Sequence, residues 1–355
     1  MTIPTIKSCD QEINPDLFKF LDEYLPFRYD SKVFEWEYGH ADKVFCYLES
    51  LDGKVLGAQG MIPIKLHCGS QLLSTAKSET SYLAAEAQGQ GLFSKLYKKT
   101  LEHTQEKGLE LIWGFTSLGP VWKKLGFHVQ NDCLLNCEVQ LRPSTLPKEF
   151  LKLRRWLGYF KSALLAVKTA QANKRMTSGI NSITYTYSES TLSTKDIQSV
   201  HEKIQKDNPQ LVALDMNEEF FEQRITKNPF IDYAFGSIND SQGQMLGYYI
   251  LATKPGAQSA YLSDVSAVNN EVKQQLISQA ITKAKADGCR TLKLFGNRLN
   301  PLMKQTLDLL DQFGTRKMDS GMYLVVKPLS DEQVAAKHNF DNWYINGLWT
   351  EGITQ

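Results

Sequence analysis

Residues 78–96 read SETSYLAAEAQGQGLFSKL and carry the most informative pattern in the chain. Residues 78–84 predict a strand, and the apolar positions after Gly91 recur at helical spacing. Glycine tolerates positive φ angles and lets a ligand approach the backbone, so residues 88–91 (Gln-Gly-Gln-Gly) predict a tight turn. N–H groups in such a turn, with the positive end of the helix dipole, bind phosphate without a cationic side chain. The alternative is an ordinary strand-to-helix turn.

The segments around this turn predict alternating strands and helices. We expect a short helix at 17–25, strands at 44–48, 55–64, 71–73 and 78–84, a helix at 92–107, a strand at 109–115, a short helix at 121–127 and a closing strand at 134–141. Asp52-Gly53 is typical of a hairpin between two of these strands. Neither a P-loop nor a complete GxGxxG fingerprint is present, so the common nucleotide-binding motifs do not explain the turn.

In this context, residues 44–135 resemble the GNAT superfamily of acyl-CoA-dependent N-acyltransferases. The family's pyrophosphate turn is [QR]-x-x-G-x-[GA], and residues 88–93 read Gln-Gly-Gln-Gly-Leu-Phe, with Phe93 where the family prefers a small residue. A second family signature is a tyrosine a few residues before Leu-Gly-Phe. Residues 125–127 supply Leu-Gly-Phe, and Trp122 stands in the tyrosine position. Phe93 is expected either to fill the core or to narrow the approach of the pantetheine arm.

The resemblance implies an acetyl-CoA site and no metal. Backbone groups of Leu83 and Ala85 would pair with the pantetheine, and amides from Gln88 to Phe93 would hold the pyrophosphate. The complete implied set is Leu83, Ala84, Ala85, Gln88, Gly89, Gln90, Gly91, Leu92 and Phe93. The thioester would lie where strands 78–84 and 109–115 separate.

Three residues are the candidates for catalysis. Glu79 lies on the strand leading into the turn, where some relatives carry a catalytic carboxylate, and it is the candidate base. Thr116 and Ser117 are candidates for stabilising the leaving thiolate. Trp122 cannot protonate a thiolate, because its indole N–H is a donor that does not ionise usefully. Tyr82 and Tyr97 are substitutes that the sequence does not place.

The second half repeats the order of elements of the first. Its strand-to-helix turn, within 264–274, has no glycine, so we expect a degenerate GNAT-like copy that does not bind CoA and instead contributes to the acceptor site. The predicted fold is α/β (α+β): two tandem GNAT-like domains, each a mixed, mostly antiparallel twisted sheet flanked by helices. The predicted domains are 1–148 (CoA-binding), 149–178 (basic linker helix), 179–330 (degenerate copy) and 331–355 (an aromatic tail that packs on the body).

The linker helix allows two interpretations. Its apolar residues share one stripe, namely Leu153, Trp156, Leu157, Phe160, Leu164 and Val167, and many of the others are basic. One interpretation is contact with a membrane surface or an anionic substrate. The other, which we favour at this point, is a linker that packs its stripe on a domain.

Composition limits the class of protein. The chain has 355 residues, 42% hydrophobic and 22% charged, with 40 Lys and Arg against 39 Asp and Glu. This near-neutral balance gives no indication of a nucleic-acid partner. No apolar run is long enough to span a bilayer, and the six dispersed cysteines suit a reducing compartment, so we expect a cytoplasmic protein.

The favoured function is an N-acyltransferase that moves an acetyl group from acetyl-CoA to a small-molecule amine, for which an amino sugar is one candidate. A FemAB-like aminoacyl transferase and a non-catalytic acyl-CoA-binding module are the alternatives. The assembly considered is a homodimer.

Overall fold

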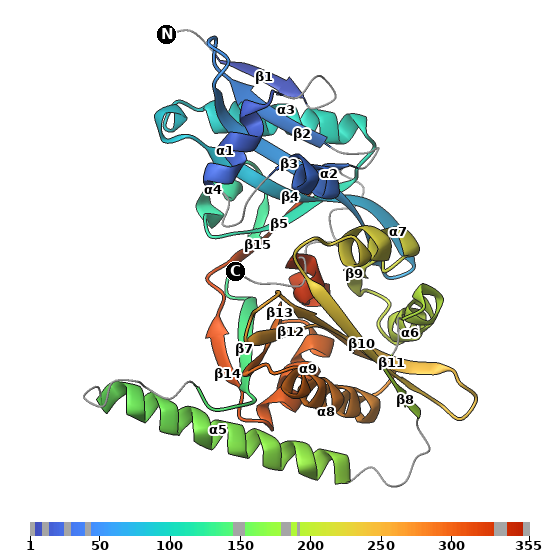
Figure 1. Cartoon of the computed structure of the whole chain (residues 1–355). Helices are drawn as coiled ribbons and strands as arrows, with labels where there is room; N and C mark the ends of the chain where they lie inside the picture. Colours follow the sequence, from blue (N-terminus) through green and yellow to red (C-terminus); the bar gives the residue numbers. More distant parts are fainter. Residues whose placement is uncertain are drawn as a thin grey trace. The chain divides into compact units, whose positions relative to one another are not determined.

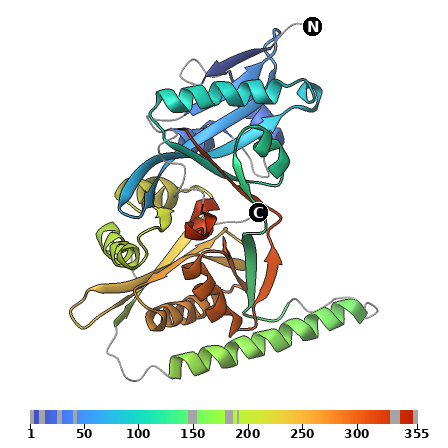
Figure 2. The same cartoon turned by 180° about the vertical axis from the view of Figure 1, so that it is seen from behind.

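The computed structural model describes residues 4–8, 14–24, 30–39, 44–144, 153–178, 186–189, 192–329 and 339–350. Within these residues the chain forms two compact units (Figure 1; Figure 2). The first unit contains the described residues up to 67 together with 71–131 and 322–329. The second contains 68–70, 132–321 and 339–350. Each unit is therefore discontinuous in sequence.

The first unit is built on a mostly antiparallel sheet with the strand order β1-β2-β3-β4-β5-β15-β6. These strands are β1 (Thr5–Ser8), β2 (Val44–Glu49), β3 (Val55–Cys68), β4 (Gln71–Leu83), β5 (Leu111–Thr116), β15 (Tyr323–Pro328) and β6 (His128–Gln130). Strands β4 and β5 pair in parallel. The helices are α1 (Asp16–Tyr24), α2 (Ser31–Tyr38), the 3-10 turn η1 (Ala85–Ala87), α3 (Leu92–Glu106) and α4 (Gly119–Lys124).

Helix α3 lies on one face of this sheet, and α1 and α2 lie on the other (Figure 1; Figure 2). Because successive side chains of a strand point to opposite faces of the sheet, β2 contributes apolar side chains to both faces. Val44 belongs to the same buried cluster as Tyr97 of α3. The next residue, Phe45, makes edge-on ring contacts with Phe34 and Tyr38 of α2 at 5.1 and 4.8 Å.

The second unit has its own sheet, in the order β14-β7-β13-β12-β11-β10-β8. These strands are β14 (Arg316–Asp319), β7 (Leu134–Gln140), β13 (Thr291–Asn297), β12 (Ser259–Ala267), β11 (Met245–Thr253), β10 (Asp232–Asn239) and β8 (Thr186–Ser188). The other elements are α5 (Leu153–Ser178), α6 (Thr194–Asp207), β9 (Val212–Leu214), α7 (Glu218–Phe220), η2 (Phe221–Thr226), α8 (Asn270–Ala286), α9 (Pro301–Asp311), η4 (Phe340–Asn342) and η5 (Gly347–Thr350).

The two sheets exchange strands. Strand β7 directly follows β6 in sequence, yet it lies between β13 and β14, with Leu135 opposite Gly296. Strand β15 follows β14, yet it lies between β5 and β6, with Leu324 opposite Phe115. The strand expected at 134–141 therefore exists, but the expectation that it closes the first sheet is wrong.

Two further strand predictions need correction. The segments at 71–73 and 78–84 are not separate strands, because β4 runs unbroken from Gln71 to Leu83. Strand β3 continues past Pro63 to Cys68, and the hydroxyl of Thr75 donates to the carbonyl of Ile64 next to the proline. This contact ties the two strands together at a position where proline offers no N–H.

The C-terminal aromatic residues pack on the second unit, as expected. Trp343 and Trp349 are fully buried, with ring centroids 5.7 Å apart. Asn297 of β13 fixes this segment, because its amide donates to the carbonyls of Phe340 and Trp343 at 2.8 and 2.9 Å.

Four residues of the apolar stripe of α5 do not pack on a domain. Leu157, Phe160, Leu164 and Val167 are 59%, 60%, 58% and 53% exposed. The favoured interpretation of a core-covering stripe is therefore wrong, and the stripe is free for another use.

Candidate functional site

A cavity of about 670 Å³ lies in the first unit beside the glycine turn. Its walls come from β4, the turn, the start of α3, the end of β5 with the following loop, α4, α1 and the residue before β15. The lining residues are Tyr24, Ser78, Glu79, Thr80, Ser81, Tyr82, Leu83, Gln88, Gly89, Phe93, Phe115, Thr116, Ser117, Leu118, Val121, Trp122 and Met322.

The cavity opens where two parallel strands separate. Strands β4 and β5 pair at only three positions, the last joining Lys77 to Trp113. The indole N–H of Trp113 donates to Thr75 Oγ1 at 3.0 Å and fixes the paired part. Beyond it, β4 continues along the cavity from Ser78 while β5 ends at Thr116. The expected gap between these strands is therefore present.

The glycine turn has the geometry of an anion site. Gly89 and Gly91 have φ angles of 74° and 71°, and a Cβ at either position would meet no atom within 4 Å. Helix α3 begins after Gly91 without any side-chain cap. Because the first N–H groups of a helix have no acceptor within it, these groups remain available to an anion on the open side of the turn.

The structure brings part of the implied CoA-binding set to the cavity. Leu83, Gln88, Gly89 and Phe93 line it, whereas Ala84, Ala85, Gln90, Gly91 and Leu92, which lie between β4 and the first residue of α3, do not. The Gln88 side chain donates to the carbonyl of Leu83 at 3.1 Å, which leaves one lone pair of that carbonyl for another donor. Phe93 lines the cavity and packs against the cluster that contains Tyr97, whereas its effect on the pantetheine arm stays a prediction.

Glu79 lies in the cavity wall and is held by a buried lysine. Its carboxylate is 2.6 Å from Nζ of Lys77, a side chain only 4% exposed, while the Glu79 side chain itself is 39% exposed. The ion pair therefore orients a carboxylate that an incoming ligand can still reach.

Tyr82 is the phenol that the sequence did not place. It lines the cavity near Glu79, and its ring centroid lies 6.0 Å from that of Tyr24. Burial raises the pKa of Tyr82, and the carboxylates of Glu79 and Glu37 raise it further. A raised pKa keeps the phenol protonated at neutral pH, so Tyr82 is available there as a hydrogen-bond donor.

Thr80 carries unusual backbone geometry inside the cavity wall. Its φ angle is 54°, a region that β-branched residues rarely adopt. The hydroxyls of Thr80 and Tyr38 lie 2.7 Å apart and hold the distortion in place. Strain at such positions is common in ligand sites.

The remaining candidates have different surroundings. Thr116 and Ser117 line the cavity, and Thr116 Oγ1 accepts from the N–H of Leu118 at 3.0 Å. Trp122 packs edge-on against the ring of Tyr97, at 5.0 Å between centroids. The hydroxyl of Tyr97 lies in the core and donates to Ser78, so this tyrosine has a structural role.

The equivalent gap in the second unit is filled. Strands β12 and β13 also pair in parallel at three positions and then separate. The C-terminal segment lies between them: the amide of Asn346 donates to Asp264 at 2.8 Å, and Gly347 packs against the backbone of Ser263. Helix α8 is also capped, because the side chain of Asn269 accepts from the N–H of Val272. In this copy the gap between the strands is thus filled, and the helix that follows β12 is capped.

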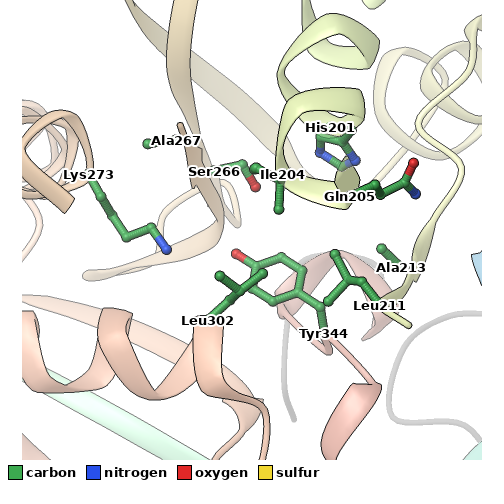
Figure 3. A pocket seen from close by; sticks show the side chains of 10 residues that line it. All are labelled: His201, Ile204, Gln205, Leu211, Ala213, Ser266, Ala267, Lys273, Leu302 and Tyr344. Carbon is green, nitrogen blue, oxygen red and sulfur yellow. The ribbon is translucent and has the colours of Figure 1, made fainter. Parts of the chain in front are cut away.

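The C-terminal segment thus forms a plug in the gap between β12 and β13. A cavity of about 20 Å³, which has room for one water, lies near this plug (Figure 3). Lys273 reaches into it and points toward the hydroxyl of Tyr344 (Figure 3). Burial lowers the pKa of Lys273 to about 8, although Asp264 partly opposes that effect. Lys273 is therefore a buried cation that lacks full compensation.

Replacing Lys273 by methionine (K273M) is expected to stabilise the protein by about 3 kcal/mol at pH 7, since the pKa is lowered from 10.5 to about 8. Between pH 8 and pH 10.5 the unfolded chain binds more protons than the folded chain, so the wild type gains stability as pH rises. The stability advantage of K273M therefore disappears by about pH 10.5. Urea unfolding at about pH 7 and about pH 10.5 measures the difference in free energy of unfolding between K273M and the wild type. Lys285→Met, an exposed position on the same helix, is the control and should change stability by less than about 0.5 kcal/mol.

No protein-family model matches the chain, and no curated protein sequence gives a significant match. Solved structures do match. A probable N-acyltransferase from Enterococcus faecalis aligns with a TM-score of 0.63 and 10% identity, over 92% of this chain and 73% of that one. Saccharomyces cerevisiae N-myristoyltransferase with bound myristoyl-CoA gives 0.56 and 12%, over 92% and 83%. A tandem GNAT protein from the clavulanic acid biosynthesis pathway gives 0.55 and 9%, over 93% and 100%. At these identities the similarity establishes the fold, and the predicted tandem GNAT-like architecture is confirmed.

Proposed function

We propose that this chain, which has the tandem GNAT fold, is an N-acyltransferase that moves an acyl group, in the simplest case acetyl, from acyl-CoA to an amine. One observation carries the proposal: an open cavity between separated parallel strands lies beside a glycine turn that leads into a helix without a side-chain N-cap. A diphosphate at that turn would direct the rest of CoA along β4 into the cavity. An amino sugar is one acceptor of the right chemistry.

The chemistry needs one bond to form and one to break. The neutral amine attacks the thioester carbon, the new C–N bond forms, and the C–S bond breaks to release CoA thiolate. Glu79 lies in the cavity wall, where it accepts the ammonium proton directly or through water. Tyr82, protonated at neutral pH, supplies a hydrogen bond or a proton to the thiolate. Thr116 and Ser117 offer hydroxyl groups at the opposite wall.

In this proposal CoA binds to the first unit alone. The filled gap and capped helix of the second unit argue that it does not bind CoA. None of the five described cysteines, Cys46, Cys68, Cys133, Cys137 and Cys289, is in a disulfide, and a need for acyl-CoA fits the same reducing compartment, the cytoplasm.

The test uses the full-length chain. Calorimetry measures CoA and acetyl-CoA binding, and a thiol reagent follows CoA release with a panel of amines that includes amino sugars. Binding with amine-dependent thiol release supports the proposal. Binding without release for any amine and any acyl chain length would indicate a sensor, and no binding would refute the CoA site itself.

Replacing Glu79 by glutamine (E79Q) is expected to lower kcat at least tenfold, because general-base catalysis typically contributes about 100-fold or more. Glu86→Gln is the matched control: Glu86 also pairs with a lysine, Lys54, but does not line the cavity. Equal activity in E79Q and E86Q would exclude Glu79 as the base.

A further inference from the structure

Helix α5 packs on the second unit through a narrow face of mostly small and polar residues. The residues at the appropriate three- and four-residue steps are Ser162, Ala166, Thr169, Asn173 and Met176. Thr169 Oγ1 donates to the carbonyl of Phe313 at 2.9 Å, and the amide of Asn173 donates to Thr282 at 3.0 Å. These contacts fix the helix and its rotation about its own axis.

The opposite face carries the exposed apolar stripe. Leu164 and Ala166 are two residues apart, which places their side chains about 200° apart around the helix. Leu157, Phe160, Leu164 and Val167, all more than half exposed, follow the same three- and four-residue steps. The ring of Trp156 lies 5.9 Å from that of Phe160 and extends the stripe. In both views α5 runs along the outside of its unit (Figure 1; Figure 2).

The charges on α5 have a single sign. Residues 153–178 contain no Asp or Glu, and the basic residues are Arg154, Arg155, Lys161, Lys168, Lys174 and Arg175. Lys161 and Lys168 are exposed and each follows a stripe residue, Phe160 and Val167. At about 100° per residue, the two lysines therefore lie along the same edge of the stripe.

We propose that α5 is a membrane-docking element that binds anionic lipid headgroups through its lysines and places its apolar stripe among the upper acyl chains. An apolar, aromatic-containing stripe bordered by lysines is the composition of helices that lie in the plane of a bilayer surface. None of the helices in the described ranges is long and apolar enough to cross a bilayer. A second copy of this chain is a poorer occupant, because two wholly basic helices would repel each other.

The test measures binding of the full-length protein to vesicles by co-sedimentation. One set of vesicles is phosphatidylcholine, and the other contains equal parts phosphatidylcholine and phosphatidylglycerol. We expect binding to the anionic vesicles only, weakening as salt rises, because salt screens headgroup charge.

Two double variants separate the apolar and the charged contributions. F160S/L164S is expected to weaken binding at least tenfold, and K161Q/K168Q about 25-fold, since each basic residue near an anionic surface contributes roughly fivefold. L51S/L72S removes exposed leucines elsewhere, 70% and 48% exposed, and K98Q/K107Q removes one exposed lysine of α3 and one directly after it. Both controls should bind as the wild type does, and circular dichroism should be unchanged throughout.

Three results would overturn the proposal. One is a wild type that ignores anionic vesicles at low salt. Another is F160S/L164S binding as tightly as the wild type. The third is a wild type that ignores vesicles but forms a dimer that F160S/L164S breaks in sedimentation equilibrium, which would assign the stripe to contact between copies. None of these results depends on whether the chain is an acyltransferase.

Discussion

Replacing Gly89 and Gly91 together by valine (G89V/G91V) is expected to weaken CoA binding by about 100-fold, which corresponds to about 2.7 kcal/mol. Both residues have positive φ angles, where a residue with a Cβ costs roughly 1–2 kcal/mol. No protein atom lies within 4 Å of a Cβ at either position, so the loss would come from backbone strain and from the new side chains entering the ligand's space. Calorimetric titration with CoA measures it.

A matched control separates binding from general strain. Gly243 and Gly256 also have positive φ angles, 80° and 76°, and open space around them, but they lie in turns of the second unit. G243V/G256V should lose similar stability in urea and keep wild-type CoA affinity. If both double variants bind CoA equally well, the glycine turn is not the diphosphate site.

Replacing Val325 by aspartate (V325D) is expected to abolish CoA binding, although this residue lies near the end of the chain. Val325 is fully buried in β15, paired with Gly114 of β5 and Val129 of β6. An unpaired carboxylate in that core should cost the first unit about 4 kcal/mol or more. Hydrogen exchange should then accelerate in 44–131 and remain slow in 245–311.

The reciprocal variant tests the strand exchange itself. Val139 is equally buried, but its strand, β7, belongs to the second sheet, where it lies opposite Leu292. V139D should therefore accelerate exchange in the second unit and leave CoA affinity within about twofold, a free-energy change under about 0.5 kcal/mol. The opposite pattern, with V139D abolishing binding and V325D sparing it, would show that each sheet is closed by its own half of the chain.

Local chemistry explains what could be predicted. The glycine turn, the helix after it and the gap between strands depend on residues close in sequence, and glycine is the residue that permits the positive φ angles at 89 and 91. The plug in the second unit involves distant segments, so the sequence could show only that its turn lacks glycine. Some of the site residues on β4, the strand before the turn, could be predicted from the sequence. Nothing local marks Met322 as part of the cavity.

Non-local pairing explains what could not be predicted. Strands β7 and β15 are both short and mostly apolar, and no local feature tells which sheet accepts which strand. The prediction of which face of α5 packs on the protein was wrong for a related reason. The apolar stripe of α5 is evident in the sequence, but the face that packs carries Ser162, Ala166 and Thr169, small residues that allow close approach.

The exchanged strand also has a consequence for synthesis on the ribosome. The glycine turn emerges early, but the strand that lies between β5 and β6 is translated more than 200 residues later. The first sheet therefore stays incomplete for most of translation. Its exposed strand edges can pair with incorrect strands during that time. A ribosome that stops before residue 323 would release a chain that holds the whole glycine turn and still lacks a finished sheet to support it.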